Sequence, residues 1–205
     1  IISEVLPTFA RKPLFGYKFV VFSGAAIGFV GWGVWAHHMF ASGLGPVSVT
    51  VFSMATMAIA VPTGVKIVNW VMTMWGGKLS FTVAMLFAVG VIVQFTIGGL
   101  SGVTHAVAPS DTQQTDTYYI VAHFHYVLVA GSLYAMFGGF YYWCPKWTGV
   151  MANETRGKIH FWGSLIFFNI AFFPMHFLGL AGMPRRYADY PLQFADFNMI
   201  VSLGA

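Results

Sequence analysis

Two closely spaced pairs of histidines have the clearest capacity for chemistry in this sequence. His37 and His38 are adjacent and lie in an apolar segment. His123 and His125 are separated by one residue in another apolar segment. A lone histidine among apolar residues is often a hydrogen-bonded packing residue, whereas ionisable groups inside a membrane tend to mark function. Two such pairs therefore indicate metal ligands.

The spacing within each pair predicts a different arrangement of metals. On an α-helix, residues i and i+2 lie about 200° apart. His123 and His125 therefore face opposite sides of one helix, and each can bind a different metal, such as the iron of one of two haems. Adjacent residues lie only about 100° apart, so His37 and His38 can converge on one ion. Imidazole ligands without a thiolate suit copper, zinc or iron.

The other histidines and the single cysteine are interpreted more simply. His160 and His176 each stand alone, and we interpret both as structural hydrogen-bonding residues. His105 lies in an expected loop, where it is either solvated or part of the lining of a site. Cys144 is the only cysteine, which excludes a disulfide or a cysteine-ligated metal within the chain.

The elements that position these histidines are expected to be membrane helices. Of the 205 residues, 58% are hydrophobic and 8% are charged, whereas soluble domains carry roughly 25% charged residues. Crossing a bilayer takes about 20 apolar residues. Five segments reach this length and a sixth begins near the end: roughly 17–42, 48–75, 80–104, 117–144 and 158–182, then 195–205. The expected fold is an all-α transmembrane helical bundle that forms a single domain over residues 1–205.

The charges predict how the bundle is oriented. If connections alternate between two faces, one face carries Arg11, Lys12, Lys18, Lys78, Lys146, Arg156 and Lys158. The other face carries only Arg185 and Arg186 among basic residues, with acids at Asp111, Asp116, Asp189 and Asp196. Basic residues favour the cytoplasmic or matrix side, so the first face is expected there. We therefore interpret the net charge of +4 as a sign of orientation in a lipid bilayer, and we expect no nucleic-acid partner.

A lysine inside the second expected span predicts a proton relay. Lys66 lies too deep for its ammonium group to reach the inner surface easily, and a buried lysine changes its protonation state readily. Thr63, one helical turn earlier, is placed to share a water or a hydrogen bond with it.

Four stretches resemble subunit I of cytochrome c oxidase, in the haem–copper oxidase superfamily. The first resembles its copper-binding helix, the second the helix of its lysine proton channel, the third its haem-binding helix and the fourth the loop over the haem propionates. In sequence order they are Trp35–Phe40, Ala60–Lys66, Asp116–Tyr126 and His176–Tyr187. The resemblance runs in register over essentially the whole chain, and it implies part of a 12-helix subunit.

The resemblance implies a metal for each histidine of the two pairs. His37 and His38 would be two of the three ligands of copper B. His123 would bind the iron of the high-spin haem a3, and His125 that of the low-spin haem a. This agrees with the opposite faces expected for His123 and His125. Phe124, between them, would lie near the electron path between the haems or would simply pack.

The resemblance also implies roles for polar residues around the metals. Lys66 and Thr63 would belong to the proton channel. Arg185 and Arg186, unusual on the acidic face, would pair with haem propionates through bidentate bonds. Asp189 is an alternative ion-pair partner for these arginines. Asp111 would lie in the propionate region, or it is a solvated loop acid.

The resemblance implies a magnesium site that lacks one of its usual ligands. Many relatives bind a non-redox magnesium through a histidine and the aspartate that follows it. Thr115 stands in place of that histidine, so Asp116 is the ligand that remains.

The implied function is that of a respiratory terminal oxidase. Electrons from cytochrome c, delivered through subunit II, would reduce O2 to water, coupled to proton pumping, with subunits II and III as partners. The location would be a bacterial plasma membrane or the mitochondrial inner membrane. The chain starts at Ile1 and ends inside an apolar run, so we expect a fragment of a longer protein. A quinol oxidase of the same superfamily and a proton-coupled transporter are the alternatives.

Overall fold

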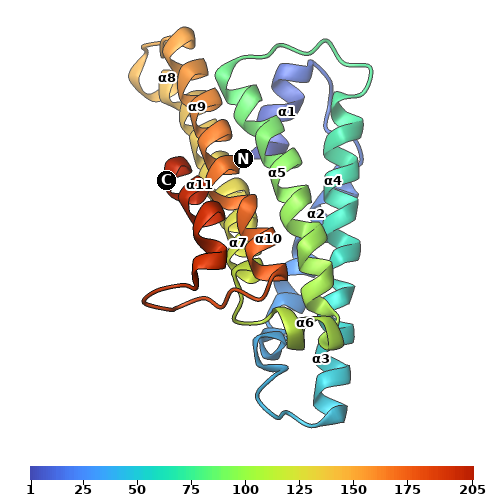
Figure 1. The fold of residues 1–205 in the computed structure, drawn as a ribbon. Coiled ribbons are helices and arrows are strands. Elements are labelled where there is room, and N and C mark those ends of the chain that lie inside the picture. Colours follow the sequence, from blue (N-terminus) through green and yellow to red (C-terminus); the bar gives the residue numbers. More distant parts are fainter.

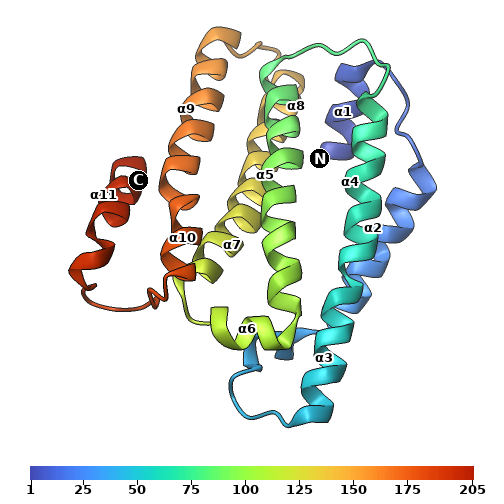
Figure 2. The same cartoon turned by 45° about the vertical axis from the view of Figure 1, so that its right-hand side comes forward.

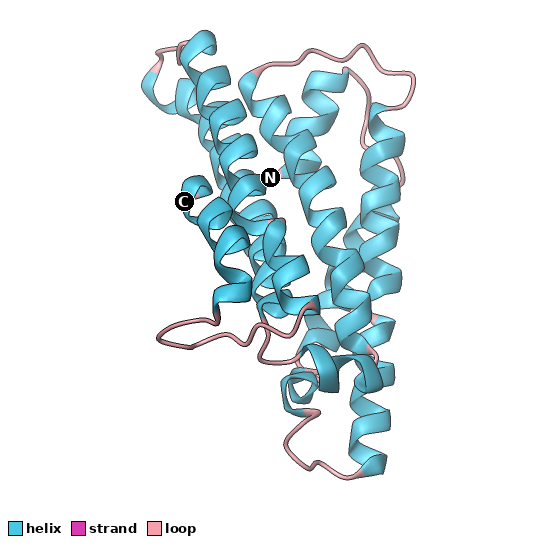
Figure 3. Cartoon of the chain, in the orientation of Figure 1, coloured by secondary structure: helices cyan, strands magenta, loops and turns pink.

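The computed structural model describes residues 1–205 as a bundle of helices without a β-strand (Figures 1 and 3). The α-helices are α1 (Ile2–Ala10), α2 (Tyr17–Gly31), α3 (Pro46–Ala58), α4 (Ala60–Met74), α5 (Val83–Ala106), α6 (Ala108–Gln114), α7 (Tyr118–Leu128), α8 (Tyr134–Thr148), α9 (Glu154–Phe172), α10 (Pro174–Leu180) and α11 (Ala195–Gly204). The shorter helical segments are two 3-10 turns, Trp35–Met39 and Leu192–Phe194, and one π-helical turn, Val129–Leu133. The all-α prediction is confirmed.

Four stretches of helix are long and apolar enough to cross a membrane. They are Pro46–Met74, Val83–Ala106, Tyr118–Thr148 and Glu154–Leu180. They correspond to the second, third, fourth and fifth expected spans, and they identify a membrane protein. Pro174 opens α10 where α9 ends, because proline lacks the N–H that would continue the ladder of helical hydrogen bonds.

The first expected span, 17–42, is not confirmed as a membrane crossing. Its helix, α2, has 15 residues and ends at Gly31. At 1.5 Å per residue this helix is about 22 Å long, less than the roughly 30 Å of a hydrocarbon core. Glycines on both sides of Trp32 favour an end to the helix, because glycine is a poor helix former. The chain then turns through the 3-10 segment that carries His37 and His38.

The N-terminal helix α1 was not expected, and it belongs to the core. Val5 and Leu6 are completely buried. They join a cluster of buried side chains from α5, α8 and α9 that includes Phe87, Tyr134 and Phe161. Pro7 lies within this helix without ending it, although its missing N–H removes one hydrogen bond from the helix.

Helix α5 is the centre of the bundle (Figure 2). It contacts α1, α3, α4, α6, α7, α8 and α9. Gly98 explains its close approach to α7, because a Cβ at this position would lie 2.9 Å from the Cβ of Tyr126. Small residues at helix interfaces of membrane proteins allow such approaches between backbones.

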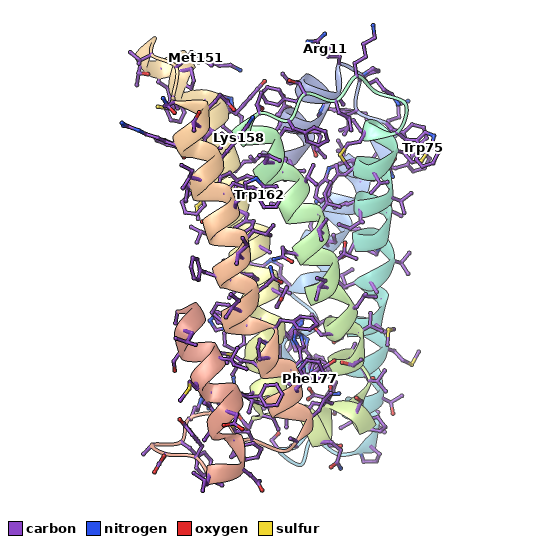
Figure 4. The ribbon with its side chains drawn as sticks, turned by 45° about the horizontal axis from the view of Figure 1, so that its top comes forward. Arg11, Trp75, Met151, Lys158, Trp162 and Phe177 are labelled. Atoms are coloured by element: carbon purple, nitrogen blue, oxygen red, sulfur yellow. The ribbon has the colours of Figure 1, made fainter.

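The two ends of the bundle differ in charge. Figure 4 shows Arg11, Trp75 and Lys158 at one end, whereas Phe177 lies toward the other. At the first end, the connections carry Arg11, Lys12 and Lys78, and the adjoining parts of α8 and α9 carry Lys146, Arg156 and Lys158. The start of α3, α6 and the loop after α10 lie at the second end (Figure 1). The second end therefore carries Asp111, Asp116 and Asp189 together with Arg185 and Arg186.

Leu6→Ala in the complete protein tests whether α1 packs in the core. The substitution is expected to lower the free energy of unfolding by about 2–5 kcal/mol, because it leaves a cavity in a packed cluster. Denaturant unfolding in detergent measures this change. Val150→Ala, at a residue in an exposed connection, is the control and is expected to have little effect. An unchanged unfolding free energy in Leu6→Ala would contradict the packing of α1.

Candidate metal centre

A cavity of about 400 Å³ lies beside α5 at the end of the bundle that carries α6. Its walls come from the 3-10 turn at Trp35–Met39 and from α3 to α7. It brings together eight of the residues named from the sequence: His37, His38, Thr63, His105, Asp111, His123, Phe124 and Arg185. His125, Lys66, Asp116 and Arg186 are not among its lining residues.

His37 and His38 converge on one point at the wall of this cavity. Their Nε2 atoms are 2.9 Å apart, and His37 Nδ1 lies 3.3 Å from the hydroxyl of Thr56 on α3. We expected His37 and His38 on an α-helix, but they lie on a 3-10 turn. Adjacent residues on such a turn are about 120° apart, so the two rings still reach each other. Two facing ring nitrogens fit one shared ion of the kind that imidazole favours, such as copper.

His123 is oriented by the backbone of α5. Its Nδ1 lies 2.9 Å from the carbonyl oxygen of Gly98 and 3.0 Å from the hydroxyl of Ser101. A carbonyl oxygen only accepts, so Nδ1 donates to it and Nε2 of the neutral ring keeps its lone pair. Gly102 gives the ring room, because a Cβ there would lie 3.0 Å from His123 Cε1. This arrangement is typical of metal-binding histidines, whose second nitrogen is commonly held by a carbonyl or carboxylate.

His125 faces away from the cavity. Its Nδ1 donates to the carbonyl oxygen of Val121 across 2.7 Å, which again leaves Nε2 with its lone pair. Its ring stacks on Phe172 of α9, with ring centroids 4.0 Å apart and planes at 17°. The two histidines of α7 thus lie in different environments, His123 against α5 and His125 against α9. This is the arrangement that the i, i+2 spacing predicts for ligands of two separate metals.

Thr63 and Lys66 lie along α4 but do not bond to each other. Thr63 lines the cavity, and its hydroxyl donates to the carbonyl oxygen of Ile59 across 2.8 Å. Lys66 is partly buried, and its Nζ lies 5.9 Å from the ring centroid of Trp70. It faces α2 at Gly24, where a Cβ would lie 3.4 Å from Nζ. Any proton passing between Thr63 and Lys66 therefore needs an intermediate carrier.

Asp116 is the ion-pair partner of the arginines. Arg185 approaches one carboxylate oxygen of Asp116 through Nε and through Nη2, both at 2.9 Å. Arg186 Nη1 lies 3.8 Å from the same oxygen. Asp189, the alternative partner, forms no ion pair, and its carboxylate accepts from the backbone N–H of Tyr190. The alternative of an Asp189 ion pair is therefore wrong.

The loop around this ion pair does not fit a magnesium site. One carboxylate oxygen of Asp116, Oδ1, already faces two arginines. No group of three or more His, Cys, Asp or Glu side chains converges on a point where an ion could bind. Asp116 and Arg186 have positive φ, at 58° and 66°, and Arg185 N–H donates to the carbonyl oxygen of Asp116. The ion pair and the backbone bond together hold this loop.

His105 is the residue whose place the sequence left undecided. It lies in the last turn of α5, is 8% exposed and lines the cavity. Its Nδ1 is 3.0 Å from a carboxylate oxygen of Asp111, which is 2% exposed. The interpretation of Asp111 as a solvated loop acid is therefore wrong. A histidine at the end of an apolar run followed six residues later by an acid was the only sequence signal for this pair.

The two histidines interpreted as structural lie outside the cavity. His160 packs on Phe87 and Phe137, and its Nδ1 lies 3.1 Å from the hydroxyl of Tyr141. His176 packs on Tyr119, and its Nδ1 lies 3.1 Å from the carbonyl oxygen of Phe173 in its own helix. Both side chains have local partners, as the structural interpretation requires.

Removing magnesium from the complete protein tests the role of Asp116. Chelation followed by gel filtration is expected to leave the midpoint of thermal unfolding unchanged, because Arg185 supplies the positive charge beside the carboxylate. Asp116→Asn, which tolerates a positive φ but loses the charge, is expected to destabilise the loop by up to about 1 kcal/mol. A midpoint that falls on chelation and recovers with added magnesium would contradict this account.

The whole chain, residues 1–205, matches the model of the family described as cytochrome c and quinol oxidase polypeptide I. Cytochrome c oxidase subunit 1 of Alkalihalophilus pseudofirmus is 52% identical over 206 residues, a match that covers 100% of this chain and 33% of that protein. The subunits of Cereibacter sphaeroides and Thermostichus vulcanus are 50% and 53% identical over 205 residues, and the matches cover 100% of this chain and 36% and 37% of those proteins. This chain spans about a third of the length of these relatives.

A solved structure has the same fold. It is a haem–copper terminal oxidase dimer that is 18% identical in sequence, with a TM-score of 0.70 over 83% of this chain and 36% of that one. The resemblance noted from four sequence motifs is thereby confirmed at the level of family and fold. Because the family model covers every residue, the chain belongs to the cytochrome c and quinol oxidase polypeptide I family.

Proposed function

We propose that this chain is the part of a respiratory terminal oxidase that holds its metals, in an enzyme that reduces O2 to water with electrons from cytochrome c. The observation that carries the proposal is the arrangement of four imidazoles. His37 and His38 share one cavity with His123, while His125 faces the other side of the same helix. A site of this kind can hold one ion and one haem on one side of α7, with a second haem on the other.

The donor atoms of these residues suit the groups that such an oxidase needs. His123 Nε2 would hold the iron of the high-spin haem a3, and His125 Nε2 that of the low-spin haem a. The facing Nε2 atoms of His37 and His38 would hold copper B. When bound, these groups supply electron transfer and the binding and reduction of O2.

The protein contributes by fixing the ligands before any metal binds. The carbonyl of Gly98 holds the His123 ring, and the carbonyl of Val121 holds the His125 ring. A hydrogen bond from the second nitrogen of an imidazole sets its tautomer and makes the ligating nitrogen more basic. Main-chain carbonyls within helices cannot rotate, so both lone pairs keep fixed directions.

Lys66 and Thr63 would supply protons to the cavity from the basic end of the bundle. Thr63 lines the cavity, and Lys66 lies one turn closer to Trp75, at the end where Figure 4 places that residue. The ammonium and hydroxyl groups can exchange protons through an intervening water. Each charge that crosses the membrane works against about 2.3 kcal/mol per 100 mV, so this relay would operate within a sealed bundle. Coupled proton pumping is part of the proposal.

The other end of the cavity suits haem propionates. Arg185 and Asp111 both line the cavity, and Arg186 follows Arg185 in the loop after α10. Arg185 already binds a carboxylate, that of Asp116, through two of its nitrogens. A guanidinium held in this way can also take up a propionate, because it presents five N–H donors.

The proposed partners follow from the proposed oxidase function. Subunit II would deliver electrons from cytochrome c, and subunit III would complete the complex in a bacterial plasma membrane or the mitochondrial inner membrane. The end of the bundle with Arg11 and Lys158 would face the cytoplasm or matrix. A quinol oxidase is the second candidate, since the family description covers both donors. A proton-coupled transporter has no need for imidazoles that point to opposite sides of one helix.

Carbon monoxide binding by the complete protein tests the role of His123. His123→Gly is expected to abolish the carbon monoxide difference spectrum of the reduced enzyme, because the haem iron loses its protein ligand. Added imidazole is expected to restore at least part of the spectrum by filling the space of the lost ring. His160→Gln, whose ring lies among aromatic side chains outside the cavity, is the control. A full spectrum in His123→Gly without imidazole would contradict the assignment.

Oxygen uptake by the complete protein tests the proton relay. Lys66→Met is expected to leave the haem spectra intact and to slow oxygen uptake by roughly 10²-fold or more, the range for a lost proton-transfer group. Lys78→Met, in the connection between α4 and α5, is the matched control and is expected to keep most of the activity. Normal uptake in Lys66→Met would remove this residue from the relay.

A further inference from the structure

Two polar side chains in the middle of the bundle are buried away from the candidate metal centre and lack hydrogen-bond partners. Gln94 on α5 is 2% exposed and Tyr134 on α8 is 1% exposed. Gln94 Nε2 and the Tyr134 hydroxyl form no hydrogen bond with another protein atom. Neither residue lines the cavity that contains His123. A buried amide or hydroxyl without a partner is strongly unfavourable.

Several other polar side chains of the bundle have partners. Thr96 donates to the carbonyl of Ile92 in its own helix, and the hydroxyl of Tyr126 donates to Asn169 of α9. Lipid provides no hydrogen-bonding groups, so a membrane bundle has to satisfy its polar atoms internally. Gln94 and Tyr134 are two of the side chains with an atom that lacks such a partner, and they lie on contacting helices.

Helical geometry directs the two side chains toward the same part of the α5–α8 interface. Helices α5 and α8 run in opposite directions (Figure 2), and long side chains in a helix tilt toward its N-terminus. Gln94 thus tilts toward Gly90, one turn earlier on α5. The ring of Tyr134 covers Gly90, where a Cβ would lie 3.2 Å from Tyr134 Cδ2. The amide and the hydroxyl consequently share one layer of the α5–α8 interface.

The π-helical turn Val129–Leu133 adds a third polar element to this layer. Tyr134 N–H donates to the carbonyl oxygen of Val129, five residues earlier. The turn packs on α5, since a Cβ at Gly131 would lie 3.0 Å from the ring of Phe95, the neighbour of Gln94. A turn widened in this way interrupts the regular i to i+4 pairing of carbonyls, and such turns recur at functional sites.

We propose that Gln94 and Tyr134 bind an internal water molecule between α5 and α8. The water accepts from Gln94 Nε2 and bonds with the Tyr134 hydroxyl, which can donate or accept. A carbonyl of the π-helical turn takes its remaining hydrogen. Buried waters usually make about three such bonds to groups that lack other partners. The site lies one helical turn from Gly98, whose carbonyl holds His123, and so completes the polar interior of α5 next to the metal centre.

A double-mutant cycle in the complete protein tests the shared water. Gln94→Met and Tyr134→Phe are each expected to lower the midpoint of thermal unfolding, because each leaves the water and the other residue short of a partner. The double variant is expected to recover most of this loss, which gives strong non-additivity. Thr96→Val, on the same helix but bonded to its own backbone, is the control and should combine additively with Tyr134→Phe.

The cycle has an outcome that overturns the proposal. If both groups are truly without partners, each single substitution raises the midpoint and the two effects add. Non-additivity would also arise from a direct hydrogen bond between Gln94 and Tyr134. A high-resolution density map of the unaltered protein distinguishes this direct bond from a shared water. Density within hydrogen-bond distance of both Gln94 and Tyr134 supports the water, whereas a direct bond between the amide and the hydroxyl overturns it. The loss of that density in the double variant is a further expected result.

Discussion

The hydrogen bond from an imidazole Nδ1 to a helix carbonyl is the interaction on which the site depends. It holds His123 to Gly98 and His125 to Val121, and in each ring it leaves one nitrogen available. The bond to Gly98 requires α5 and α7 to lie very close together, which the missing side chain of Gly98 permits. The position of α5 at the centre of the bundle therefore has a direct chemical consequence. Without that close approach, His123 would lose the group that sets its tautomer.

The ends of the bundle serve different purposes. The end near Trp75 and Lys158 carries most of the basic residues (Figure 4). The opposite end carries α6, the turn with His37 and His38, and the loop with Arg185. The candidate metal centre lies toward this second end, and α4, which carries Lys66 and Thr63, runs from it toward the first end. The proposed movement of protons and electrons through the membrane would need this combination of a buried centre and a polar connection across apolar helices.

Several features were predictable because they depend on local periodicity. The i, i+2 spacing of His123 and His125 predicts their opposite faces, since helical geometry alone fixes that angle. The apolar lengths of the second to fifth spans predict four stretches of membrane helix. The 3-10 turn at His37 was not predictable from apolar length, because glycines and tertiary contacts end α2 early. Helix α1 was missed because Glu4 and Pro7 interrupt its apolar pattern. Its burial also depends on α5, α8 and α9, which are distant in sequence.

The polar partners were harder to predict than the ligands. Asp116 and Arg185 lie far apart in sequence. Asp189 lies close to Arg185 in sequence and was therefore considered as its partner instead. The burial of Asp111 depends on α6 folding back against α5, which brings it to His105. Contacts of this kind are set by the path of the chain at the end of the bundle, and no periodic pattern encodes that path.

X-ray absorption at the copper edge of the full-length subunit, separated from its proposed partner subunits, tests the central claim most directly. The account predicts bound copper with a first shell of imidazole nitrogens, no sulfur ligand and an iron atom as a more distant scatterer. His38→Asn should deplete the copper and leave the haem content unchanged. A sulfur shell, or a protein with its full haem content and no copper, would contradict the convergence of His37, His38 and His123 on one metal centre.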